Sequence, residues 1–252
     1  MLRFYFIILI SIPLILYYII SAEKLCRNEN RYSEDDRYRL ANRIIRSVQI
    51  RGRIDTVSTG EENLPEEGGY IMYANHQGKY DALGIIASHK KPCSVVMDAK
   101  RSKVLLADQV VKLLKGKRLI RDDLKQQVKE LKALSDEARD GRKFIYFPEG
   151  GYEHNGNNMQ EFHPGAFKCA KKAQVPIVPV AIYDSFLPFA VNSLRRVTTQ
   201  VSFLEPIYYE EYADLSTKEI SDLVRNRIAK QLAVLEEIRA EKGYNNKFKL
   251  YE

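Results

Sequence analysis

The chain has 252 residues, 45% of them hydrophobic, which is enough to bury one sizeable core and too little for two equal domains of ordinary size. Forty Lys and Arg against 33 Asp and Glu give a net charge of +7, which suits an anionic surface or a phosphate-bearing ligand and equally a generic soluble protein. Three distant cysteines, Cys26, Cys93 and Cys169, form no CxxC or Cys/His pair, which excludes a disulfide framework and a zinc site.

The first segment, from Phe4 to Ile20, is apolar apart from Ser11 and predicts membrane association. It is slightly shorter than the ~20 residues of a comfortable span, and Pro13 should kink it, so a shallow re-entrant insertion competes with a crossing. A cleaved signal peptide is a third interpretation, which the bulky Tyr17 and Tyr18 near its end disfavour. The positive-inside count leans toward a cytoplasmic location for the rest of the chain, through Lys24, Arg27 and Arg31.

Residues Glu34 to Ser47 predict a helix with an apolar stripe and an arginine-rich flank. Such a helix can lie in the lipid headgroup layer or pack on its own domain, and its position next to the membrane segment favours the headgroup layer. We therefore divide the chain into a membrane anchor with an interfacial helix, residues 1–47, and an α/β domain, residues 48–252.

The α/β domain is predicted from short β-rich runs that alternate with helical stretches. It should be a mixed sheet flanked by helices. A surface loop, Thr59 to Gly69, precedes the second strand. Helices are predicted from Asp122 to Asp140 and from a Ser216/Glu219 capping box to a stop at Gly243. The predicted strands are Val48 to Val57, Tyr70 to Ala74, Cys93 to Met97, Arg118 to Ile120, Lys143 to Phe147, Ile177 to Ile182 and Val197 to Phe203.

The stretch Ala74-Asn75-His76-Gln77-Gly78-Lys79-Tyr80-Asp81 follows an apolar strand and precedes a helical run. On a regular helix, His76 and Asp81 would diverge by ~140°, so they can pair only if the chain turns between them, which Gly78 permits. A paired carboxylate would fix the tautomer of His76 and support it as a general base toward an alcohol. From spacing alone, an unrelated loop histidine and capping aspartate are the simpler interpretation.

A second stretch, Phe144 to Gly150, is an apolar strand that ends in a turn with Glu149 at its tip. Pro148 and Gly150 should hold Glu149 at the sheet edge and leave backbone N–H groups facing a ligand. An ordinary strand-end turn is the alternative.

Together these stretches resemble the glycerolipid acyltransferases of the lysophosphatidic acid acyltransferase (PlsC-like) family. The family signatures are an Asn-His-x4-Asp block, an Arg-bearing strand, a Phe-Pro-Glu-Gly block and a Val-Pro-Ile-x-Pro-Val block. All four occur in order, over roughly residues 48–207, as Asn75 to Asp81, Gly116 to Arg121, Phe147 to Gly150 and Val175 to Val180.

The resemblance implies direct transfer of a fatty acyl group from acyl-CoA or acyl-carrier protein to a lysophospholipid hydroxyl, foremost that of 1-acyl-sn-glycerol 3-phosphate. It makes His76 the general base and Asp81 its orienting partner. It also assigns the acceptor to a group of substrate-binding residues: Arg121, Lys117, Arg118, Glu149 and Gly150. No cofactor and no metal are expected, and the partners are the two substrates and a membrane.

The residues themselves agree on charge. Between Lys100 and Arg121 the chain places eight Lys or Arg against a single carboxylate, Asp108, which predicts an anionic ligand. The stretch has no aromatic side chains to stack bases, which argues against a nucleic acid.

Two positions depart from the family pattern. Ile120 stands where the family has an aspartate before Arg121, and Gly151-Tyr152-Glu153 replaces Thr-Arg-Ser, so an expected phosphate-contacting arginine is missing. A different lysolipid acceptor therefore stays open, as does a non-catalytic lipid-binding protein on the same fold. A metal-dependent phosphoesterase would need further ligands beside His76 and Asp81.

Three other histidines carry weaker expectations. His154 and His163 could be proposed as second bases, but the Pro164-Gly165 turn makes a structural or substrate-lining place the better interpretation for His163. His89, beside Lys90 and Lys91, is predicted to be solvated.

Overall fold

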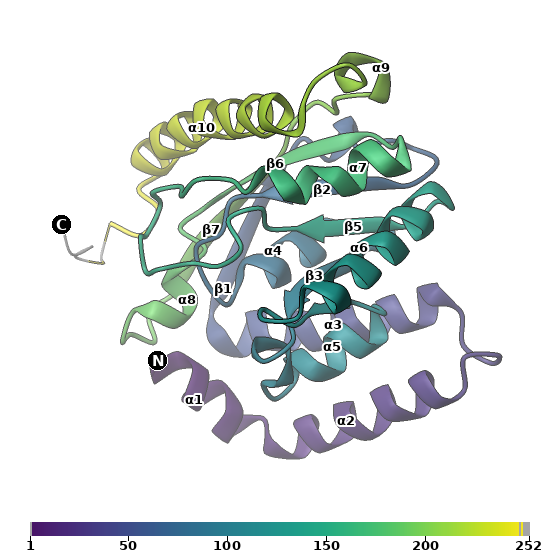
Figure 1. Ribbon diagram of the computed structural model, residues 1–252. Coiled ribbons are helices and arrows are strands. Elements are labelled where there is room, and N and C mark those ends of the chain that lie inside the picture. Colours follow the sequence, from purple (N-terminus) through teal and green to yellow (C-terminus); the bar gives the residue numbers. More distant parts are fainter. Residues whose placement is uncertain (1, 247, 249–252) are drawn as a thin grey trace.

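A computed structural model describes residues 2–246 and 248. Within them, one seven-stranded mixed sheet has the order β1-β7-β6-β2-β5-β3-β4 (Figure 1). Neighbouring strands are parallel except β6 and β7, which are antiparallel. The strands are β1 (Ile54–Thr59), β2 (Tyr70–Ala74), β3 (Ser94–Asp98), β4 (Lys117–Leu119), β5 (Lys143–Tyr146), β6 (Ile177–Tyr183) and β7 (Val197–Phe203). The predicted fold class, a mixed sheet flanked by helices, is confirmed.

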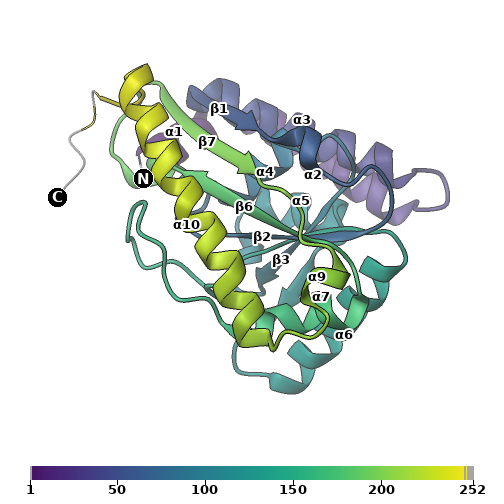
Figure 2. The same ribbon diagram turned by 90° about the horizontal axis from the view of Figure 1, so that it is seen from above.

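Helices cover both faces of this sheet, as Figure 2 shows from above. The α-helices are α1 (Leu2–Ile10), α2 (Ile12–Arg27), α3 (Glu34–Gly52), α4 (Asp81–Ser88), α5 (Ala107–Leu113), α6 (Leu124–Arg139), α7 (Lys168–Ala173), α8 (Leu187–Ala190), α9 (Tyr209–Tyr212) and α10 (Thr217–Lys242). The described residues also form the short 3-10 turns η1 (Glu61–Asn63), η2 (Arg101–Lys103) and η3 (Pro164–Phe167).

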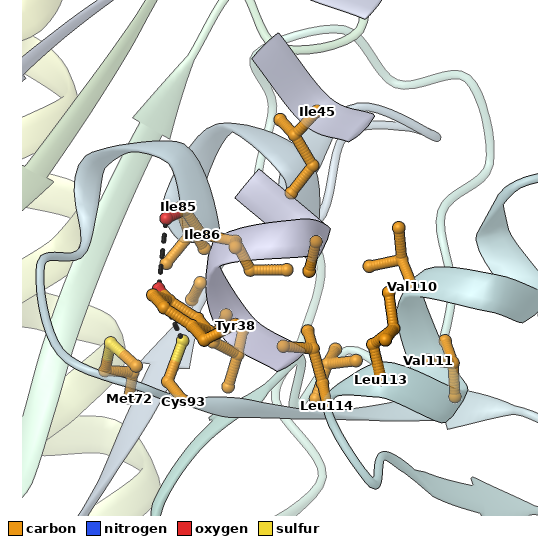
Figure 3. Packing of buried hydrophobic residues seen from close by; sticks show 14 of the residues in the cluster. Tyr38, Ile45, Met72, Ile85, Ile86, Cys93, Val110, Val111, Leu113 and Leu114 are labelled. Atoms are coloured by element: carbon orange, nitrogen blue, oxygen red, sulfur yellow. Dashed lines mark hydrogen bonds between the residues drawn. The ribbon is translucent and has the colours of Figure 1, made fainter. Parts of the chain in front are cut away.

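Strand β2 shows how the sheet separates two cores. Its alternate side chains Tyr70, Met72 and Ala74 join the core under α3, α4 and α5, while Ile71 and Tyr73 join the core under α6, α7 and α10. This follows from the two-residue period of a strand that is buried on both faces. Figure 3 shows the first core around a tyrosine of α3, whose hydroxyl donates to a carbonyl oxygen of α4.

Helix α3 is longer than predicted. It begins at the Ser33 cap and continues to Gly52, so the strand predicted from Val48 is wrong at its start and β1 begins only at Ile54. Arg53, in the left-handed conformation, ends the helix. The boundary placed after Ser47 therefore falls inside a continuous helix.

The apolar stripe of α3 is buried. Its members pack in the core of the α/β domain and leave Arg39, Arg43 and Arg46 on the outer side; they are Tyr38, Leu40, Ala41, Ile44 and Ile45. The stripe therefore packs on its own domain, and the placement of this helix in the lipid headgroup layer stays a prediction.

The apolar N-terminal segment forms two helices rather than one. Helices α1 and α2 meet at Ser11 with a bend of 79°, two residues before Pro13. Among the described residues no single helix is long and apolar enough to cross a membrane, although this bent pair passes the test of length and composition together. Helix α2 packs against α3 and α5, and α1 packs against α3 and α8 (Figure 1).

A buried arginine fixes α1 to the domain. The Arg3 side chain is fully buried, and its guanidinium donates to the carbonyl oxygens of Pro188 in α8, at 2.9 Å, and of Arg195 beyond it. Burial lowers the pKa of Arg3 to about 10, so the group stays charged at neutral pH. The start of the apolar segment is thus held in place by a charged group.

Candidate active site

Two turns meet at one edge of the sheet, where the parallel strands β2 and β5 end side by side, with Tyr73 opposite Tyr146. The chain after β2 carries His76, and the chain after β5 carries Glu149. They touch: the His76 backbone N–H donates to Glu149 Oε1 at 2.9 Å. Because parallel strands place their carboxyl ends at the same edge, the first and third signature blocks form one site.

His76 and Asp81 form a hydrogen-bonded pair. His76 Nδ1 lies 2.6 Å from Asp81 Oδ2, and the same oxygen accepts the backbone N–H groups of Gln77 at 2.6 Å and Gly78 at 2.9 Å. Three donors on one oxygen hold the buried aspartate as a carboxylate acceptor, which assigns the Nδ1 proton to His76 and leaves Nε2 as the basic nitrogen. The chain turns between the two residues, and Asp81 is the first residue of α4.

Asn75 ties this turn to the neighbouring strand. Its side-chain amide donates to the carbonyl oxygen of Ile182 at 3.0 Å and accepts the N–H of the same residue at 2.8 Å. Asn75 is 1% exposed, so this paired amide substitutes for strand pairing that ends at β2. The asparagine before His76 is therefore an anchor of the loop.

The ring of His76 is held between two aromatic side chains. Phe147 stacks on it with centroids 4.4 Å apart and planes 23° apart, and Tyr152 meets it edge-on at 4.8 Å. The side chain keeps 17% of its surface exposed. The imidazole is thus fixed in orientation and still open to a substrate on one side.

Glu149 is buried, with 6% of its surface exposed. Burial raises its pKa to about 7, although the His76 backbone N–H and the Gln160 side-chain amide both hydrogen-bond to it and act in the opposite direction. Its neighbour Gly150 has φ +70°, a conformation that favours glycine. The Gly150 N–H donates to Phe147 O and so does not face a ligand, while the expectation for the other backbone N–H groups of the turn stays a prediction.

The predicted phosphate-binding cations are not gathered at one point. Arg121 reaches the Glu149 turn, where its guanidinium lies 3.4 Å from the Gly150 carbonyl oxygen. Lys117 instead forms an ion pair with Glu137 of α6, and Arg118 pairs with Asp108 at 2.8 Å. The assignment of the last two cations to the acceptor stays a prediction, and their paired carboxylates offset much of their charge.

The site also contains a cation that the sequence motifs did not single out. The Arg101 guanidinium, from η2, lies over the Tyr152 ring at 4.8 Å from its centroid, and that ring contacts His76. The only sequence signal was its place in the basic stretch that begins at Lys100. In the family pattern an arginine of this turn itself is expected, and here Arg101 of η2 lies beside Tyr152 instead.

The remaining histidines lie outside the His76/Asp81 pair. The exposed His163 packs its ring against Gly150, where an added Cβ would approach within 3.1 Å. His89 is buried rather than solvated, which corrects the prediction: its ring joins the Tyr70 hydroxyl at 2.6 Å, and burial lowers its pKa to about 4. The cause is the packing of α4 against the sheet, which a pattern of neighbouring lysines does not reveal.

The structure places no group of three or more His, Cys, Asp or Glu side chains where they could hold a metal ion, within residues 2–246 and 248.

The chain is similar to several known proteins. It is 31% identical over 190 residues to the human 1-acyl-sn-glycerol-3-phosphate acyltransferase alpha, an alignment that covers 72% of this chain and 64% of that one, so the chain spans just under two thirds of this relative. It is 26% identical over 193 residues to the 1-acyl-sn-glycerol-3-phosphate acyltransferase of Borreliella burgdorferi, covering 72% and 73% of the two chains.

A solved structure shares the fold. The 1-acyl-sn-glycerophosphate acyltransferase PlsC from Thermotoga maritima superposes with a TM-score of 0.72 at 20% identity, over 93% of this chain and 94% of that one. The model of the family described as Acyltransferase matches residues 55–183, slightly more than half of the chain and both turns of the site. The chain therefore belongs to the Acyltransferase family.

Proposed function

We propose that this chain transfers a fatty acyl group from acyl-CoA or acyl-carrier protein to the free hydroxyl of 1-acyl-sn-glycerol 3-phosphate, giving phosphatidic acid. The observation that carries the proposal is the hydrogen bond between His76 Nδ1 and Asp81 Oδ2 at 2.6 Å, at the edge of the sheet and beside a buried Glu149. The names of the relatives support the choice of acceptor.

The reaction needs one base and no covalent enzyme intermediate. His76 Nε2 takes the proton of the acceptor hydroxyl as its oxygen attacks the thioester carbonyl carbon. The C–S bond then breaks, and the thiol leaves with the proton that His76 held. Asp81 keeps the Nδ1 proton in place and stabilises the imidazolium between the two steps.

Arg101 and Arg121 are the cations best placed for the acceptor phosphate. Both reach the turn after β5, one over Tyr152 and the other at the Gly150 carbonyl oxygen. Guanidinium groups bind phosphate with paired, charge-assisted hydrogen bonds, and these two, unlike Arg118, lack a carboxylate partner among the described residues. These two arginines supply positive charge at the turn where Tyr152 replaces the arginine of the family pattern.

The membrane is the source of the acceptor. The outer sides of α1 and α2 expose a row of large apolar side chains, among them Tyr5 at 61%, Leu9 at 69% and Ile20 at 69%. Since the two helices bend by 79°, we propose that they lie in one leaflet with the α/β domain on the cytoplasmic side.

The function is tested with purified protein, a panel of lysolipids that includes monoacylglycerol and its phosphate, and both donors. Transfer to the phosphate-bearing acceptor is expected, and a His76→Ala variant should lose roughly 10²–10⁴-fold in kcat. His154→Ala is the matched control and should keep the activity, because this exposed histidine is not hydrogen-bonded to the pair.

Two results would contradict the proposal. Failure to acylate any lysolipid would favour a lipid-binding protein on this fold, and transfer to monoacylglycerol in preference to its phosphate would favour a different acceptor. Full activity in His76→Ala would contradict the role of His76 as the general base, but it would not contradict the assignment of the two substrates.

A further inference from the structure

Asp184 is a buried carboxylate that the reaction does not use. It follows β6, is 0% exposed, and has φ +56°, a conformation that aspartate and asparagine adopt more readily than most residues. Its Oδ2 accepts from Arg239 Nε at 2.8 Å and Asn245 Nδ2 at 2.6 Å, which come from the last turns of α10 and the residues beyond. A buried charge costs several kcal/mol unless it is paired, so this arrangement calls for an explanation.

The other oxygen of Asp184 leads toward His76. Asp184 Oδ1 accepts from Asn157 Nδ2 at 2.9 Å, and the Asp184 backbone N–H donates to Asn157 Oδ1 at 2.8 Å. Asn157 Oδ1 also accepts from Gln77 Nε2 at 2.9 Å. Asp184 therefore decides which way the Asn157 amide points, and Asn157 in turn receives the Gln77 amide.

Gln77 is the link to the reacting pair. Its side chain is buried, since the residue is 2% exposed, and it is bound at both ends, donating to Ile182 O at 3.0 Å and accepting from the Ser185 N–H at 2.8 Å. Its backbone N–H donates to the Asp81 oxygen that faces His76 Nδ1. The side chain thus fixes the turn that brings His76 and Asp81 together.

We propose that Asp184 is a positioning residue for the His76/Asp81 pair, acting through Asn157 and Gln77. The proposal rests on the proposed function, since it assigns these residues to the geometry of that general base. Arg239 of α10 and Asn245 beyond it fix the Asp184 carboxylate. The hydrogen bonds from Asp184 through Asn157 to Gln77 then fix the turn that carries His76, so α10 contributes to the geometry of the general base.

The Asn157 amide and the Asp184 carboxylate can be exchanged between the two positions. In Asn157→Asp, two carboxylates face each other where one amide donated to a carboxylate, so the bond becomes a repulsion. In Asp184→Asn, two amide N–H groups compete at the same place. In the double variant the new amide at position 184 can donate to the new carboxylate at position 157 and still accept from Arg239 and Asn245. This restores the hydrogen-bond pattern at unchanged net charge, although the bond from Arg239 then goes to an amide oxygen instead of a carboxylate.

The experiment measures kcat and KM for both substrates in the two single variants and the double variant. Each single variant should lose roughly ten- to hundredfold in kcat with KM little changed, because a displacement near 1 Å at the base has about that cost. The double variant should recover most of this loss. Asp55→Asn, which removes an exposed ion pair with Arg196, is the control and should retain wild-type values.

A second readout does not depend on activity. The proton on His76 Nδ1, hydrogen-bonded to Asp81, should give a downfield ¹H NMR signal that is lost or shifted in each single variant and returns in the double variant. Absence of transfer by the wild-type chain would end the proposed function, while this signal would still decide the positioning role. Gln77→Glu, which loses the donor toward Asn157, should reproduce the single-variant result if Asn157→Asp does not fold.

Wild-type kcat and an unchanged His76 signal in both single variants would overturn the proposal. It would also fall if the double variant were as impaired as the single variants while folding with wild-type stability.

Discussion

The Glu149 carboxylate lies in the protein interior with a backbone N–H and one amide as its partners, and these do not replace the water it has lost. Its pKa of about 7 is the result. The folded-state value lies above the usual 4.5, so the folded chain keeps a proton that the unfolded chain releases. The contribution of this bound proton to the free energy of unfolding is complete below pH 4.5 and is lost as the pH rises through 7.

Glu149→Gln should remove this pH dependence. Relative to wild type, the free energy of unfolding of the variant should rise between pH 5 and pH 8 by an amount on the order of 3 kcal/mol at most, since one pKa unit corresponds to about 1.4 kcal/mol. Urea unfolding at both pH values measures it, and subtracting the pH 5 difference cancels the packing effect of the amide. Glu161→Gln, whose side chain is 82% exposed, serves as the control. An equal difference at both pH values would show that Glu149 is ionised throughout.

Among the elements, α10 links stability and the site. It covers β6 and carries Arg239 near its end, which holds Asp184. Its start is fixed by a capping box: Ser216 Oγ accepts from the Glu219 N–H at 3.2 Å, and Glu219 Oε2 accepts from the Ser216 N–H at 2.7 Å. The sequence predicted both this cap and the stop at Gly243, because both depend on residues close together in the chain.

Ser216→Ala should therefore destabilise the protein by about 1 kcal/mol, the usual cost of a lost N-cap. Thr217→Ala, one residue further along, is the comparison and should change the free energy of unfolding by less than about 0.5 kcal/mol. Chemical denaturation monitored by circular dichroism separates the two. A Ser216→Ala value as small as that of Thr217→Ala would mean that packing alone fixes the start of α10.

At the scale of the whole molecule, apolar area is distributed unevenly. The α/β domain buries its apolar side chains in two large clusters and a smaller one, whereas α1 and α2 leave large apolar side chains exposed. Exposed apolar area of this kind marks an interaction surface. Arg3, bonded to the carbonyl oxygens around α8, holds that surface in a fixed relation to the domain.

A Leu9→Glu/Ile20→Glu variant should bind vesicles of phosphatidylethanolamine and phosphatidylglycerol at least about tenfold more weakly than wild type, because each residue loses roughly 1–2 kcal/mol of apolar burial in the interface. Co-sedimentation measures the bound fraction. Val234→Glu, a substitution of an exposed apolar residue on α10, should leave binding unchanged. An equal loss of vesicle binding in this control would mean that the added negative charge, repelled by the anionic lipid, causes the effect.

The sequence by itself determined the α/β class, six of the seven strands to within a residue or two, the capped α10, and the residues of the four signature blocks. These features follow from period-two alternation, from capping within one turn, and from short motifs, all of them local along the chain. The first strand was misplaced because Val48 and Ile50 favour a strand locally while the helix begun at Ser33 continues through them.

Only the tertiary structure decided which of these residues meet. His76 and Glu149, 73 positions apart, touch because β2 and β5 are parallel neighbours, and Asp184 reaches the same turn through a residue of a distant loop. The packing of distant segments also buries His89, which was expected to be solvated, and brings Glu137 and Asp108 into ion pairs with Lys117 and Arg118. Contacts between distant segments depend on strand order and on what covers each face, and neither is written in any short stretch of the chain.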